Sequence, residues 1–116
     1  MYQYTTPLVI LRFAKVDFNS VFVWRVSVQN EDHFSIVKEY FKDDANLNSS
    51  LHTINVELTQ EETASMKPGI VSVQVRALLD SGRVYASKSV DIALKPVQDE
   101  EVLVFTTEEN DNETQE

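Results

Sequence analysis

Apolar and polar residues alternate along much of the chain, and this period of two is typical of β-strands that bury one face. The clearest run covers residues 70–79, where Val71, Val73 and Val75 alternate with polar side chains. Only two glycines and three prolines interrupt the chain. We therefore expect an all-β fold built from antiparallel strands.

The turn Asp80-Ser81-Gly82-Arg83 follows this run and predicts a hairpin, because glycine supplies the positive φ that a short loop needs. The second strand of the hairpin is expected from Val84 to about Leu94. Its alternation places Val90, Ile92 and Leu94 on one face. These two strands form the first predicted pair.

Two further segments have the pattern of strands. Residues 20–28 are rich in valine, phenylalanine and tryptophan. Residues 51–58 alternate, with Ile54, Val56 and Leu58 directed inward. Counting all strand-like segments gives six or seven, which predicts an antiparallel β-sandwich.

Two short segments need separate interpretation. In residues 33–42, Ile36 and Tyr40 suit a strand, whereas Val37 and Phe41 suit a helix, and we predict a strand. The sequence Thr59-Gln60-Glu61-Glu62 matches a capping box, in which the threonine hydroxyl and the glutamate carboxylate each accept a hydrogen bond from a backbone N–H. One short helical turn is therefore expected to follow Thr59.

The net charge of −9 is concentrated at the C-terminal end. Residues 99–116 contain eight acidic and no basic side chains, which leaves 11 acidic and 10 basic side chains in residues 1–98. We expect a nearly neutral β-sandwich domain over 1–98 and an acidic C-terminal segment over 99–116. Within that segment, the apolar run Val102-Leu103-Val104-Phe105 predicts an edge strand or a docking segment.

The composition argues against several classes of site. Without cysteine there is no disulfide, thiolate zinc site or cysteine nucleophile. The two histidines, His33 and His52, do not stand at a metal-ligand spacing, and no glycine-rich phosphate loop is present. We expect no enzymatic activity, no metal and no cofactor.

The charge pattern and the first residues also restrict the partners. No basic stripe with interleaved aromatic residues is present, so we expect no binding to nucleic acid. No basic region precedes the short apolar run Leu8–Leu11, which ends at Arg12. We therefore expect neither a secretory signal peptide nor insertion into a membrane.

Aromatic residues supply most of the candidate contact positions. Trp24 lies mid-strand, which is typical of a core residue, with an exposed platform for a sugar or a protein as the alternative. Tyr2 and Tyr4 stand two apart on the expected first strand and would face one side. The predicted partner-binding residues are Tyr2, Tyr4, Trp24, Val102, Leu103, Val104 and Phe105.

Five motifs follow one another within residues 56–104: Leu58-Thr59-Gln60-Glu61-Glu62-Thr63, Lys67-Pro68-Gly69, Val73-Gln74-Val75-Arg76-Ala77-Leu78, Ser81-Gly82 and Tyr85-Ala86-Ser87. In the order and spacing of these motifs, this part of the chain resembles small structural proteins encoded among the tail and baseplate genes of siphophages that infect Gram-positive bacteria. It is also similar to the β-sandwich "shoulder" domain of lactococcal phage receptor-binding proteins.

The resemblance implies a non-enzymatic structural or accessory protein of the tail or baseplate region that acts through protein–protein contacts in assembly or host attachment. Its partners would be phage tail or baseplate subunits, including copies of itself, with a trimer as one arrangement. It would reside in the virion, or in the host cytoplasm during assembly. Two alternatives stay open: a carbohydrate-binding module for host envelope glycans, and a small intracellular phage factor that binds a host protein.

Overall fold

The computed structural model describes residues 1–104, which form an antiparallel β-sandwich with one 3-10 helix and one short α-helix. The elements in chain order are β1 (Leu8–Arg12), η1 (Phe18–Ser20), β2 (Val21–Gln29), β3 (Ser35–Phe41), β4 (Leu47–Asn48), β5 (Thr53–Glu57), α1 (Gln60–Ser65), β6 (Gly69–Leu79), β7 (Val84–Ala86) and β8 (Val90–Leu94). The predicted fold class is confirmed. These residues contain eight strands because β4 is very short and the last expected strand is divided into β7 and β8.

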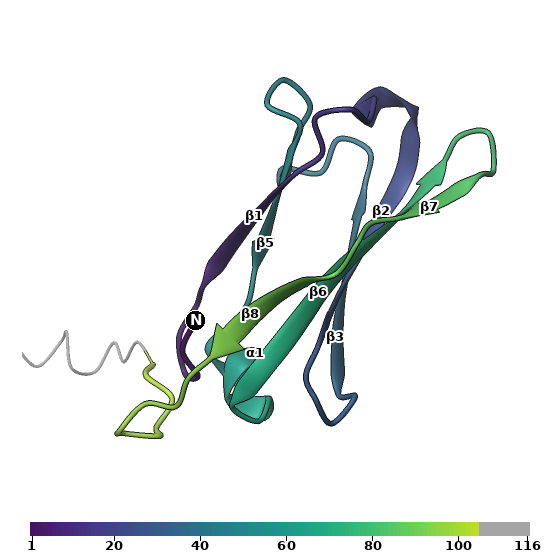
Figure 1. The fold of residues 1–116 in the computed structure, drawn as a ribbon. Coiled ribbons are helices and arrows are strands. Elements are labelled where there is room, and N and C mark those ends of the chain that lie inside the picture. Colours follow the sequence, from purple (N-terminus) through teal and green to yellow (C-terminus); the bar gives the residue numbers. More distant parts are fainter. Residues whose placement is uncertain (105–116) are drawn as a thin grey trace, which may run out of the picture.

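Two sheets make up the sandwich (Figure 1). The smaller sheet has the order β1-β5-β4, and the larger has the order β3-β2-β6, with β7 and β8 both paired to the far edge of β6. The long strand β6 runs from the end of the molecule that carries α1 to the hairpin that joins β6 to β7 (Figure 1). The two ends of β6 therefore define two opposite ends of the molecule.

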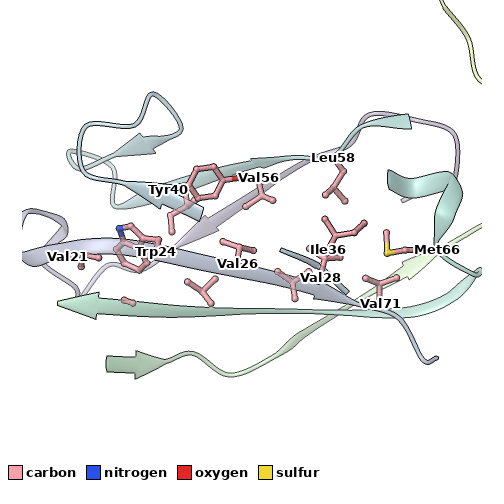
Figure 2. Packing of buried hydrophobic residues seen from close by; sticks show 14 of the residues in the cluster. Val21, Trp24, Val26, Val28, Ile36, Tyr40, Val56, Leu58, Met66 and Val71 are labelled. Carbon is pink, nitrogen blue, oxygen red and sulfur yellow. The ribbon is translucent and has the colours of Figure 1, made fainter. Parts of the chain in front are cut away.

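The core lies between the two sheets, and valine is its most frequent residue (Figure 2). Alternate residues of β2 and β6 point inward and are buried, as the pattern in residues 70–79 predicted. From the smaller sheet and the residue after it, Ile54, Val56 and Leu58 are buried against them, which confirms the predicted inward face of residues 51–58. Burial of these apolar side chains is the main stabilising contribution to the sandwich.

Residues 33–42 form a strand, as predicted, and not a helix. Each residue of β3 from Ser35 to Phe41 has a register partner on β2. Ile36 and Tyr40 are buried, whereas Val37 is exposed on the outer face. Pairing with β2 thus decides between the two periods that the sequence allows.

The predicted capping box begins α1. The Thr59 side chain accepts a hydrogen bond from the Glu62 backbone N–H at 3.0 Å, and the Glu62 carboxylate accepts one from the Thr59 backbone N–H at 2.9 Å. The hydroxyl of the buried Thr63 donates to the backbone oxygen of Thr5 at 2.9 Å. The helix therefore also holds the N-terminal segment in place.

β2 contains a bulge near its start. Val21 opposes Leu79 and Val23 opposes Leu78, so Phe22 is an extra residue between two successive register positions. Val21 is buried, whereas Phe22 is half exposed. A bulge re-aims side chains, and here it interrupts the strict alternation that the sequence of β2 implies.

A second bulge separates β7 from β8 and corrects the prediction of one continuous strand over residues 84–94. Ala86 and Val90 are four positions apart, whereas their partners on β6, Arg76 and Val73, are three positions apart, so this edge contains one extra residue. Ser87 fills the gap: its backbone N–H donates to the Val75 oxygen at 2.8 Å, and its hydroxyl accepts from the Val75 N–H at 3.0 Å. Val90 pairs on the inner face as predicted, but Val84 pairs on the outer face.

The N-terminal residues correct another prediction, because Tyr2 and Tyr4 precede the first strand, which begins at Leu8. Tyr4 has a positive φ of 59°, and the Thr5 hydroxyl donates to the Tyr2 oxygen at 2.6 Å, so these residues form a turn. Side chains two positions apart point to the same side only where the backbone is extended as in a strand. Tyr2 and Tyr4 therefore do not share one side of a strand, and that prediction is wrong.

Candidate functional site

The predicted partner-binding residues lie in separate parts of the structure. Trp24 is in the core, whereas Tyr2 is 50% exposed beside Lys95, whose ammonium lies 6.0 Å from the ring centre. Val102, Leu103 and Val104 follow the last strand and are exposed. Phe105 lies outside the described residues. The structure thus offers no single surface that joins them.

Trp24 is a core residue, as its mid-strand position predicted, and the alternative of an exposed partner-binding platform is wrong. Its side chain is only 2% exposed, and its ring packs against Phe18 and Phe13 at centroid distances of 4.7 and 5.3 Å. Among the described residues, its Nε1 is the one buried side-chain polar atom without a hydrogen-bond partner. The aromatic surroundings fill space and offer the indole N–H no acceptor.

The segment Val102–Val104 is neither an edge strand nor packed into the sandwich. The Gln60 side chain holds it by two hydrogen bonds, from its Nε2 to the Leu103 oxygen at 2.6 Å and from the Leu103 N–H to its Oε1 at 2.8 Å. Leu103 and Val104 remain 74% and 70% exposed. The backbone is therefore anchored at α1 while the apolar side chains stay available for contact.

The outer face of the five-stranded sheet carries an apolar surface, which we call the outer stripe. Four of its members are register partners on neighbouring strands: Phe41, Val23, Leu78 and Val84. Phe22, the extra residue of the first bulge, is the fifth member. The rings of Phe22 and Phe41 meet edge to face, with centroids 5.7 Å apart. Both rings are 49% exposed and Val84 is 55% exposed, so the stripe presents much of its area to solvent.

A groove of about 280 Å³ runs beside the outer stripe. Its walls combine Val23, Leu78 and Val84 with three charged side chains, Arg25, Arg76 and Glu39. The Arg25 guanidinium pairs with the Glu39 carboxylate at 3.4 Å, and both side chains are about half exposed. The groove therefore has an apolar side and a charged side.

The two arginines of the groove directly oppose each other across β2 and β6. On its other side Arg76 faces Ala86 of β7. Within residues 1–104, Arg76 belongs to none of the ion pairs. The groove consequently has a net positive charge in a protein whose total charge is −9.

A second, larger hollow of about 660 Å³ lies between β3 and the start of α1. Tyr40, Lys38, Glu57 and Gln60 are among its lining residues. The Lys38 ammonium is held by the Glu62 carboxylate at 2.8 Å, with about a quarter of each side chain exposed. Leu8 and Leu58 also line this hollow, so it offers a ligand both hydrogen bonds and apolar contact.

The titratable groups at this hollow have shifted pKa values. Burial raises the pKa of Tyr40, and the nearby carboxylates of Asp44, Glu57 and Glu62 raise it further. Partial burial alone would raise the pKa of Glu62, but hydrogen bonds from Lys38 and Thr59 outweigh this effect and lower it. Tyr40 is therefore protonated and Glu62 is ionised at neutral pH. That the protein has no enzymatic activity is still a prediction.

Two further findings concern metal binding and membrane-spanning helices. Within residues 1–104, no group of three or more His, Cys, Asp or Glu side chains could hold a metal ion. Over the same residues, no helix is both long and apolar enough to span a bilayer.

Comparison with known protein families finds no match, and comparison with curated proteins finds no relative of this chain. The candidate site therefore rests on the structure itself. Sequence reasoning missed the outer stripe, because alternation assigns one face per strand and two bulges change that assignment. The available signal was the presence of apolar residues at positions that alternation directs outward: Val23, Phe41 and Leu78.

Proposed function

We propose that this chain is a non-enzymatic structural or accessory protein of a phage tail or baseplate region, and that it binds neighbouring subunits through the outer stripe. The resemblance of residues 56–104 to siphophage tail-region proteins supports the setting. The exposed apolar surface supports the mode of action. The protein would then act by contact alone, in assembly or in host attachment.

The outer stripe is the observation that carries this proposal. The solvent face of an antiparallel sheet is normally polar, because only the other face packs on the core. Here apolar residues continue across four strands on the solvent face, and two phenylalanine rings form its exposed end. Contiguous apolar surface rimmed by charged side chains is typical of protein interfaces.

The first test is an immunoblot of purified virions of the phage that encodes this chain. We expect the protein to co-purify with the particles at a fixed ratio to the other tail proteins. Its absence from particles would contradict the structural role and favour the intracellular factor that binds a host protein.

A variant then tests the outer stripe itself. Phe41→Thr keeps a residue with high strand propensity but removes half of the exposed aromatic pair. We expect incorporation into particles to fall by about tenfold or more, because interface aromatics contribute much of the binding free energy. Ile10→Thr is the matched control, since Ile10 is 60% exposed on β1 in the other sheet. Equal incorporation of both variants would contradict the assignment of the stripe.

A further inference from the structure

We propose that the groove beside the outer stripe binds residues 99–104 of a second copy of this chain, so that copies associate head to tail. The inference rests on the proposed function, since it names a partner for the same surface. Its first argument is the charge of the groove. Arg25 and Arg76 are directly opposed across the sheet, and like charges in such positions destabilise the sheet. Glu39 offsets one of them, and an acidic partner would offset the other.

Residues 99–104 have the complementary chemistry. Asp99, Glu100 and Glu101 carry three negative charges, and Val102, Leu103 and Val104 follow directly. All six residues are exposed. An acidic stretch joined to an apolar stretch matches a groove whose walls are cationic on one side and apolar on the other.

The Gln60 side chain prepares this segment for binding. Its two hydrogen bonds to the Leu103 backbone hold the chain next to α1. Because the backbone is already held at one point, less conformational entropy is lost when the segment binds a partner. The hydrogen bonds use only backbone groups of Leu103, so its side chain stays free for the contact.

The position of the segment makes the contact intermolecular. Gln60 lies at the end of the molecule where β6 begins, whereas Leu78 and Val84 lie at the hairpin end (Figure 1). Leu78 lies nine residue steps along β6 from Gly69, which is about 30 Å of strand. The segment held by Gln60 therefore cannot reach the groove of its own chain.

The groove and residues 99–104 are different surfaces of the chain, so the contact between copies is heterologous. It repeats from one copy to the next as a ring or an open row. A symmetric dimer formed through the grooves would instead bring four arginines together and bury them against like charge. The contact is small, so we expect a dissociation constant between about 1 μM and 1 mM.

Sedimentation velocity of the full chain over a concentration series tests the proposal. We expect mass to increase with concentration and the association to weaken about tenfold or more when salt is raised from about 0.15 M to 1 M, because salt screens exposed charge pairs. Arg76→Glu should weaken association by about tenfold or more, and Leu103→Asp should do the same by placing a charge in the apolar contact. The carboxylate introduced by Arg76→Glu would face Arg25, so this variant keeps a favourable cross-strand pair.

Two controls match these changes in chemistry but not in position. Arg12→Glu reverses an exposed arginine on β1, and Leu51→Asp places a charge at an exposed leucine outside the strands. Both controls should associate like the unmodified chain. Thermal melts followed by circular dichroism should show all four variants folded.

Mixing the two binding variants gives the most specific result. Arg76→Glu keeps an intact segment and Leu103→Asp keeps an intact groove. Each variant alone should associate about tenfold or more weakly than the unmodified chain, whereas the mixture should form a dimer, and nothing larger, with close to the unmodified affinity. The proposal is overturned if the unmodified chain is monomeric at every concentration, if either binding variant associates like its control, or if the mixture stays monomeric. A monomer that still co-purifies with virions would overturn this inference and leave the proposed function standing.

Discussion

Trp24 is buried in the core while its one polar side-chain atom has no hydrogen-bond partner among the described residues. The indole ring fills the space between β2 and the segment that contains Phe13 and Phe18. Its N–H has no acceptor among the described residues. Leaving a buried donor unpaired costs about 1–3 kcal/mol, and the apolar contacts of the large ring must exceed that cost.

Two substitutions separate these effects. Trp24→Ala should lower the free energy of unfolding by about 3–5 kcal/mol, because it leaves a cavity in the core. Trp24→Phe should cost only about 1–2 kcal/mol, since the smaller ring keeps most contacts and removes the unpaired N–H. Urea unfolding of both variants measures the difference. Equal losses would contradict this account of the indole nitrogen.

Glu62 combines a helix cap with an ion pair, which makes its contribution to stability depend on pH. The folded state lowers its pKa below the ordinary value of 4.5. A lowered pKa means that the ionised form stabilises the fold above pH 4.5, and that this contribution is lost as pH falls through the folded pKa.

We expect Glu62→Gln to reduce stability by about 1 kcal/mol at pH 7, chiefly through loss of the ion pair with Lys38, because glutamine can still accept the capping hydrogen bond. The difference from the unmodified chain should shrink below pH 4.5. Glu61→Gln is the matched control in the same helical turn. A difference that stays constant down to about pH 2 would contradict the role of the charge.

At the scale of elements, the two bulges decide the faces on which Phe22 and Val84 lie. The first bulge turns Phe22 to the same outer face as Val23, and the second places Val84 on the outer face. The inner face keeps its valines in both cases. The core therefore follows from alternation, and so do the outward positions of Val23, Phe41 and Leu78. Phe22 and Val84 join the outer stripe through the two bulges.

Ser87 is the residue that stabilises the second bulge. Ser87→Ala removes the hydroxyl that accepts from the Val75 N–H, so we expect a loss of about 1 kcal/mol in thermal or urea unfolding. Amide exchange at Val75 should become faster. Ser89→Ala, an exposed serine two positions later, should change neither quantity. Unchanged exchange at Val75 in the Ser87 variant would show that its hydroxyl does not hold the bulge.

At the scale of the whole molecule, the sandwich is complete at Lys95. Its backbone N–H donates to the Met1 oxygen at 2.8 Å, and its oxygen accepts from the Gln3 N–H at 2.9 Å, so the last strand and the N-terminal segment close the fold together. Beyond it, the hydrogen bonds between Gln60 and Leu103 are exposed.

A chain that ends at Pro96 should therefore fold cooperatively and lose no more than about 1 kcal/mol in free energy of unfolding. The same truncation should abolish head-to-tail association, since it removes the segment that fills the groove. Differential scanning calorimetry measures the first effect and light scattering the second. A broad, non-cooperative transition would show that the C-terminal segment belongs to the folded domain.

The alternating pattern of residues 51–58 and 70–79, the capping box at Thr59 and the acidic C-terminal end were determined by the sequence itself. Each of these features depends on residues that are close in the sequence. The alternating pattern reflects burial of every second residue, the capping box reflects hydrogen bonds between residues three positions apart, and the acidic end reflects composition. The fold class follows from them, because strands with one apolar face must pack against another sheet.

Only the tertiary structure decided which surface is exposed for contact. Phe41, Phe22, Val23, Leu78 and Val84 come from four strands, and register across those strands, with two bulges, brings them together. The same register opposes Arg25 and Arg76, which are 51 positions apart in the chain. Pairings between distant residues depend on how strands align, and alignment is a property of the folded sheet that local periodicity does not contain.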